Sequence, residues 1–111
     1  MSKIIEKLND IFGAEVSDED QLHFANGIAD RVRRDEAVMA QVDGHSPDQV
    51  MHGLLPKRLT DLVLDSMTDH EKLSMEILES EPKQRAFALL ILSLLKSPSH
   101  KRTLNDASSQ S

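Results

Sequence analysis

The spacing of the apolar residues constrains this chain more than any other feature. From Ile4 to Leu95, apolar side chains recur every three or four positions, which is the repeat of an amphipathic helix. No β-type alternation lasts long enough to predict a sheet, and no internal repeat is visible. We therefore predict an all-α fold, a compact bundle of five to six helices over residues 1–96, followed by a disordered polar tail over residues 97–111.

Serine, proline and glycine mark where most of the helices begin and end. Gly13 closes the first helix, and Ser17 is placed to cap the second. A short third helix is expected over residues 35–42, with Gly44 as its stop. Ser46 and Ser80 each precede a helix that has proline in its first turn. We expect the first of these two helices to be brief and the second to cover about residues 82–96.

The longest predicted helix covers about residues 57–79, and Pro56 opens it. A single helix is favoured because seven residues stay in phase on one face: Leu59, Leu62, Val63, Ser66, His70, Leu73 and Ile77. Thr68 and Glu71 have the spacing of a second capping box, so a break remains the alternative. On one unbroken helix, Asp61, Asp65 and Asp69 share a polar edge and His70 lies on the packed face.

Composition limits the core and the compartment. Three phenylalanines are the only aromatic residues besides histidine, so we expect an aliphatic core. The chain has no cysteine, which excludes disulfides and thiolate chemistry. The N-terminal segment does not resemble a signal peptide, and the longest apolar run, residues 86–95, is too short to span a bilayer. We expect a cytoplasmic protein with no membrane partner.

The charge of the chain disfavours nucleic acid as a direct partner. Residues 1–96 carry 11 basic and 18 acidic groups, a net charge of −7, and such a body repels a phosphate backbone. The one basic cluster is Arg31, Arg33 and Arg34, and Asp35 and Glu36 follow it directly. We interpret the cluster as a solvated helix end, with a phosphate contact as the alternative.

No combination of residues predicts an active site. Pro47-Asp48 and Glu81-Pro82-Lys83 match the PD…ExK nuclease string, but both acids fall in first helical turns, where the helix dipole favours them. The histidines at 45, 52 and 70 lack zinc-site spacing, and no glycine-rich phosphate loop is present. We predict no catalytic residue, no cofactor and no metal site in this chain.

The last helix is apolar on two sides. Phe87, Leu90, Ile91, Leu94 and Leu95 form one face, whereas Leu89 and Leu92 lie opposite, flanked by Arg85 and Lys96. Such a helix either occupies the centre of the domain or also meets a partner. The predicted partner interface therefore contains two groups of residues, one from this helix and one from the acidic edge: Arg85, Leu89, Leu92 and Lys96, with Asp61 and Asp65.

Two phrases of this sequence stand out: IEKLNDIFG at residues 5–13, and DLVLDSM at residues 61–67 followed by Asp69-His70. Together they resemble the C-terminal region of the R subunit, the motor and restriction subunit, of type I restriction enzymes. The resemblance covers about residues 3–96. The sequence departs from the family pattern at Gly44-His45 and at Leu54-Leu55, both before the long helix.

The resemblance implies a function that the residues alone do not indicate. In such enzymes the nuclease and translocase modules lie upstream, and the helical C-terminal region helps to dock the R subunit onto the methyltransferase and specificity subunits. We therefore expect a non-catalytic docking module that meets DNA only through the complex. Two alternatives remain: a DNA or nucleotide contact through the arginine cluster or Lys57 and Arg58, and a free-standing homodimer formed through Leu89 and Leu92.

Overall fold

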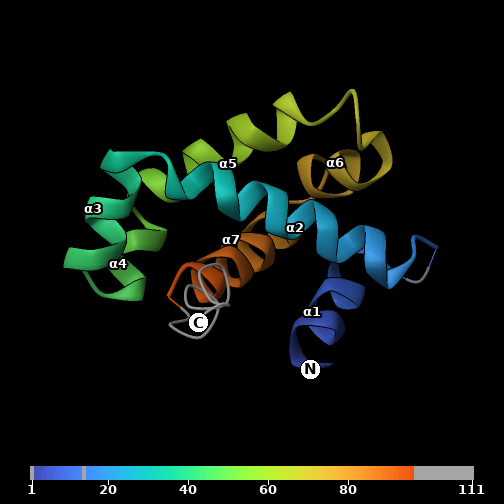
Figure 1. Cartoon of the computed structure of the whole chain (residues 1–111), viewed down its shortest axis with the longest axis horizontal. Helices are drawn as coiled ribbons and strands as arrows, with labels where there is room; N and C mark the ends of the chain where they lie inside the picture. The colour runs from blue at the N-terminus through green and yellow to red at the C-terminus, as the bar shows by residue number, and fades with distance from the viewer. Residues whose placement is uncertain (1, 14, 97–111) are drawn as a thin grey trace, which may run out of the picture.

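Seven helices form in the part of the chain that the computed structural model describes, residues 2–13 and 15–96, and these residues contain no strand. Figure 1 shows their order: α1 (Ser2–Phe12), α2 (Asp18–Arg33), α3 (Glu36–Gly44), α4 (Pro47–Met51), α5 (Leu54–Asp65), α6 (Glu71–Leu78) and α7 (Glu81–Leu95). The predicted all-α class is confirmed. The predicted tail, residues 97–111, lies outside the described residues.

Helix α7 is the central element of the bundle. It contacts α1, α2, α4, α5 and α6, and α2 crosses in front of it in Figure 1, with α3 and α4 at one end of the molecule and α1 and α6 at the other. Seven residues of α7 are buried: Phe87, Ala88, Leu90, Ile91, Leu92, Leu94 and Leu95. The apolar character of this helix on two sides therefore follows from its central position.

Three phenylalanines meet where α1, α2 and α7 come together. The ring centroid of Phe12 lies 5.9 Å from that of Phe24 and 6.1 Å from that of Phe87, and Phe24 and Phe87 are 5.7 Å apart. All three side chains are at least 94% buried. Apart from this cluster the buried apolar side chains are aliphatic, as expected.

Local sequence signals place most of the helix ends. The side chains of Ser17, Ser46 and Ser80 each accept a hydrogen bond from the backbone N–H three residues on, and Ser46 forms a complete capping box with Gln49. Gly13 follows α1 with a φ of +81°, a conformation that glycine adopts without strain. These predicted boundaries are confirmed. Two others shift slightly, because Gly44 is the last residue of α3 and α5 begins two residues before Pro56.

The single helix predicted over residues 57–79 is wrong. Helix α5 ends at Asp65, a turn follows, and α6 begins at Glu71. His70 is the N-cap residue of α6 and is only partly buried, with its ring against Phe24 at a centroid distance of 5.3 Å. Asp69 consequently does not share a helix with Asp61 and Asp65, and His70 does not lie on a continuous packed face.

Candidate docking surface

The exposed side of α7 forms a ridge, which we call the α7 ridge. Its members are the exposed residues of the helix and its C-cap, and all lie within about a third of the helix circumference: Glu81, Pro82, Arg85, Leu89, Ser93 and Lys96. Leu89 is the one large apolar residue among them, and 49% of it is exposed. Arg85 makes no ion pair with the residues that the structure describes. The ridge therefore offers one large apolar group and two cations, Arg85 and Lys96, to a partner.

The predicted pairing of Leu89 with Leu92 is corrected by the structure. Leu92 is 4% exposed, so it belongs to the core and cannot meet a partner directly. The two residues are three positions apart, which turns Leu92 about 60° away from Leu89, toward the side on which α4 and α5 pack against α7. Of the two leucines, only Leu89 can contribute to an interface.

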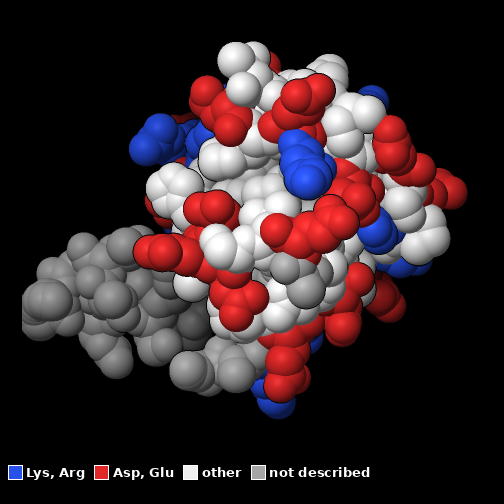
Figure 2. Space-filling model, turned by 90° about the vertical axis from the view of Figure 1, so that its right-hand side faces the viewer, with Lys and Arg blue, Asp and Glu red and all other residues white. Residues whose placement is uncertain are grey.

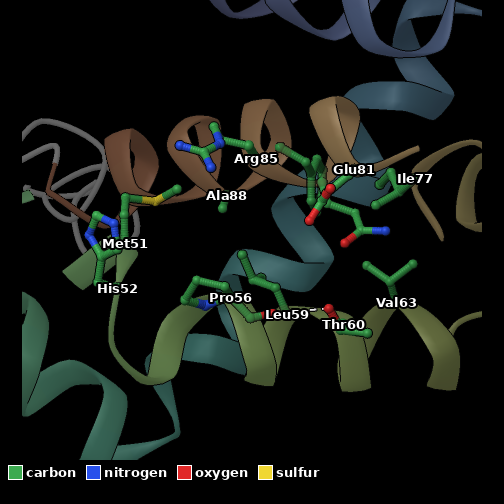
Figure 3. Close-up of a pocket in the computed structure, with 12 residues that line it drawn as sticks. Met51, His52, Pro56, Leu59, Thr60, Val63, Ile77, Glu81, Arg85 and Ala88 are labelled. Atoms are coloured by element: carbon green, nitrogen blue, oxygen red, sulfur yellow. Dashed lines mark hydrogen bonds between the residues drawn. The ribbon is translucent and has the colours of Figure 1, made fainter. Parts of the chain in front are cut away.

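A groove runs along one side of the α7 ridge, between α5 and α7, and encloses about 180 Å³. Five buried side chains give it an apolar floor: Leu59, Val63, Ile77, Phe87 and Ala88. In Figure 3, Glu81 and Arg85 border it from α7, Thr60 borders it from α5, and Met51 and His52 close one end from α4. We call this feature the α5–α7 groove. Its volume resembles that of a cavity of about 150 Å³ that accepts benzene.

The polar groups at the rim of this groove are few and partly engaged. The Thr60 hydroxyl donates to the carbonyl oxygen of Pro56 over 3.1 Å, and Nδ1 of His52 lies 2.8 Å from the carbonyl oxygen of Asp48. No nucleophilic side chain that lines this groove is hydrogen-bonded to a side chain that could act as its base. The groove is suited to receive an apolar side chain, with Arg85 and Glu81 as charged neighbours.

A second hollow lies on the other side of the α7 ridge, between α1 and α7. It encloses about 420 Å³, and Ile11, Pro82, Ala86, Leu89 and Leu90 supply its apolar lining. Lys7, Asp10 and Lys83 supply charges of both signs at its edge. We call this feature the α1–α7 hollow. The ridge thus separates two concave surfaces.

The predicted interface residues do not form one surface. Asp61 and Asp65 are exposed on α5, but at 100° per residue they point away from the side of α5 that lines the groove. Asp65 also pairs with Arg31 of α2 over 3.0 Å. The structure therefore places Arg85, Leu89 and Lys96 together on α7, and leaves Asp61 and Asp65 on a separate edge.

The arginine cluster is largely engaged within the protein. Arg31 pairs with Asp65, whereas Arg33 pairs with Asp30 over 2.5 Å and donates to the carbonyl oxygen of Leu94 over 3.3 Å. Arg34 makes no ion pair among the described residues. Because a phosphate would have to displace these intramolecular partners, the cluster is a poor anion site.

The neighbouring cation Arg58 is also occupied, by Asp35 at the start of α3. The backbone amide of Val38, which donates to the Asp35 carboxylate over 3.2 Å, lowers the pKa of this carboxyl below its ordinary value. Desolvation opposes this shift, and the Arg58 guanidinium reinforces it. Asp35 therefore serves as the N-cap of α3 and as the ion-pair partner of Arg58.

The side of the molecule where α1, α6 and the start of α2 lie is strongly acidic. Figure 2 shows acidic side chains spread across this face, with few basic ones between them. Exposed acids at the α1–α2 connection and at the start of α6 contribute to it: Glu15, Asp18, Glu19, Asp20, Asp69 and Glu71. Among these acids, Glu15 pairs with a cation, Lys72, over 3.5 Å.

Within residues 2–13 and 15–96, no group of three or more histidine, aspartate or glutamate side chains is arranged to hold a metal ion. Asp48 and Glu81, the acids of the nuclease-like string, begin two separate helices, as predicted. None of the described helices combines the length and the apolar character that crossing a membrane requires. Comparisons with protein-family models, curated proteins and solved structures found no match.

The α5–α7 groove is the part of the site that the sequence did not predict. Its residues come from α4, α5, α6 and α7, and they converge because α5 ends at Asp65 and α6 turns back toward α7. No motif links Met51, Thr60 and Arg85 along the chain. The sequence signals only where two of these helices begin: Pro47-Asp48 marks the start of α4, and Glu81-Pro82 marks the start of α7.

Proposed function

We propose that this chain is a non-catalytic docking module, as expected from its resemblance to the C-terminal region of type I restriction enzyme R subunits. In such a complex it would hold the R subunit against the methyltransferase and specificity subunits, and would meet DNA only through them. The observation that carries the proposal is the α5–α7 groove, an apolar cleft that flanks the exposed side of the central helix.

The physical character of the groove supports binding of a protein. Its floor is made of buried aliphatic and aromatic side chains, and its rim carries Arg85 and Glu81. Interface hot spots commonly consist of an apolar anchor in such a pocket, surrounded by polar groups that exclude water. A partner that places an apolar side chain between α5 and α7 would also bring a polar group near Arg85.

Co-elution of the chain with a methyltransferase–specificity core tests this proposal. Thr60→Arg fills the mouth of the groove from an exposed position, so we expect it to lower affinity for the core at least about tenfold while the helix content is unchanged. Leu64→Arg is the matched control, because Leu64 lies on the same helix, is 57% exposed and does not line the groove. Equal binding by the two variants, or no co-elution of the folded wild-type chain, would contradict the proposal.

A contact with DNA is the weaker alternative. Arg31, Arg33 and Arg58 all have intramolecular partners, and the described residues carry a net negative charge. Of the five basic residues considered for this contact, Arg34 and Lys57 could approach a phosphate without breaking an ion pair seen in the described residues. Salt-dependent DNA binding by the isolated chain would be needed to revive this function.

A further inference from the structure

The α5–α7 groove lies within reach of the tail, residues 97–111, which follows α7. Lys96, the C-cap residue of α7, comes eleven positions after Arg85 at the rim of the groove. At 100° and 1.5 Å per residue, Lys96 lies about 16 Å along the helix axis from Arg85 and only about 20° around it. The tail therefore starts on the side of α7 that borders the groove. Leu104 follows Lys96 by eight residues, which span up to about 26 Å when extended, so its side chain can reach the groove floor.

The groove has the size and the lining for a leucine side chain. Leu104 is the one large apolar residue among residues 97–111. The groove encloses about 180 Å³ over an apolar floor that includes Leu59, Val63 and Ala88. A cavity of about 150 Å³ accepts benzene, which has more carbon atoms than the isobutyl side chain of leucine. Leu104 therefore fits between α5 and α7 without a change in the helices.

Two charged side chains beside the groove make no ion pair with the residues that the structure describes. They are Arg85 on α7 and Asp48 on α4, which lies one helical turn before His52 and bonds to its ring through the backbone carbonyl. Figure 3 shows His52 at the end of the groove toward the C-terminus of α7, with Arg85 further along. A tail that turns back along α7 therefore passes Asp48 before it reaches Arg85.

The tail carries charges in the matching order. Arg102 precedes Leu104 by two residues, and Asp106 follows it by two. In an extended segment these three side chains point the same way, about 7 Å apart. With Leu104 on the groove floor, Arg102 lies toward Asp48 and Asp106 lies toward Arg85. The tail has two basic groups and one acidic group, a net charge of +1, so residues 1–96, with a net charge of −7, attract it.

We propose that the tail binds in the α5–α7 groove of its own chain, with Leu104 on the floor, Arg102 beside Asp48 and Asp106 beside Arg85. A short tether holds the leucine at an effective concentration on the order of 1 mM, so a contact too weak to join two chains is occupied within one. The tail thereby covers the surface that a docking partner would use. Only this competition rests on the proposed docking function; the contact itself does not.

Methyl NMR of the full chain, labelled with [methyl-¹³C]methionine, tests the contact without any partner. Met51 lines the groove, whereas Met67 and Met75 do not. We expect Leu104→Ser to shift the methyl signal of Met51 and to leave those of Met67 and Met75 in place. Ala107→Ser, a matched change elsewhere in the tail, should shift none of the three. An unmoved Met51 signal, or an equal response to the two variants, would overturn the proposal.

Disulfide formation measures the proximity directly, because the chain has no cysteine of its own. Thr60→Cys with Asn105→Cys places one thiol at the mouth of the groove and the other beside Leu104. This pair should oxidise at least about tenfold faster than Leu89→Cys with Asn105→Cys. Leu89 is only two turns from Lys96 but faces the α1–α7 hollow, so random encounters would favour it. Equal rates would reject the contact.

Co-elution with a methyltransferase–specificity core separates this proposal from the docking function. Removing a tail that covers the groove at least half of the time should raise affinity for the core about twofold or more, so we expect Leu104→Ser to bind more tightly than the wild-type chain. Equal affinities would contradict the competition. A Met51 shift in Leu104→Ser without co-elution of either chain would support the tail contact and count against docking alone.

Discussion

At the scale of single residues, one amide side chain closes the start of α5. Oε1 of Gln41, on α3, accepts a hydrogen bond from the backbone N–H of Leu54 over 2.9 Å. Helix α5 has no cap from its own N-cap residue, Gly53. A Cβ atom at Gly53 would lie 2.3 Å from Oε1 of Gln41, so glycine is what allows the amide to approach.

Replacing either residue should therefore remove the same hydrogen bond. We expect Gln41→Ala to lower the free energy of unfolding by about 1 kcal/mol, as loss of an N-cap commonly does. Gly53→Ala should have a similar effect, because the new methyl group displaces the amide. The double variant should be little worse than either single one, as measured by urea unfolding. If the loss of unfolding free energy in the double variant equals the sum of the two single losses, the two residues act independently.

The caps show which interactions can be predicted from sequence. The side chains of Ser17, Ser46 and Ser80 accept hydrogen bonds from backbone N–H groups three residues on, so the interaction is local and its spacing can be read from the sequence. Gln41 lies 13 residues before Leu54. Its role depends on how α3 and α5 are placed in space, which no local pattern encodes.

At the scale of helices, the break between α5 and α6 shows the limit of periodicity. The turn keeps a helix-like hydrogen bond, from the N–H of His70 to the carbonyl oxygen of Ser66 over 2.8 Å. Apolar residues therefore remain in phase on both sides. The Ser66 hydroxyl donates to the carbonyl oxygen of Leu62 over 3.0 Å, an interaction that often bends helices. No glycine or proline marks this break in the sequence.

The starts of α6 and α7 should respond differently to the loss of a hydroxyl. Ser80→Ala removes the cap of α7, the central helix, and should cost about 1 kcal/mol, or about 4–8 °C in Tm. Thr68→Ala should have almost no effect, because the start of α6 has no side-chain cap. Thermal unfolding of both variants checks this. A destabilising Thr68→Ala would indicate the capping box that the sequence offered.

At the scale of the whole molecule, the phenylalanine cluster joins helices from both ends of the described chain. Phe87→Ala should lower the free energy of unfolding by about 3–5 kcal/mol, a large part of the roughly 5–15 kcal/mol that stabilises a typical domain. Phe87→Leu, which preserves most of the volume, should cost less than about 1.5 kcal/mol. Chemical unfolding measures the free energy of unfolding of both variants. Similar losses of stability would mean that neighbouring side chains close the cavity that Phe87→Ala leaves at this junction.

The candidate interface was only partly predictable for a related reason. Periodicity showed that α7 has apolar residues on two sides, and the structure confirms that it is central. Whether Leu89 or Leu92 stays exposed depends on α4 and α5, which pack on one side of α7 only. Likewise, Asp61 and Asp65 belong to a separate edge because of how α5 is rotated. These outcomes depend on contacts between segments far apart in the chain.

The phenylalanine cluster also determines how this protein can be observed. Phe12, Phe24 and Phe87 are the only benzene rings in a chain without tyrosine or tryptophan, and they all lie at one junction. Methyl groups shifted upfield by ring currents should therefore come mainly from side chains around the meeting point of α1, α2 and α7. A proton NMR spectrum would then report on that junction specifically, without any label, while the folding of the remaining helices is followed by circular dichroism.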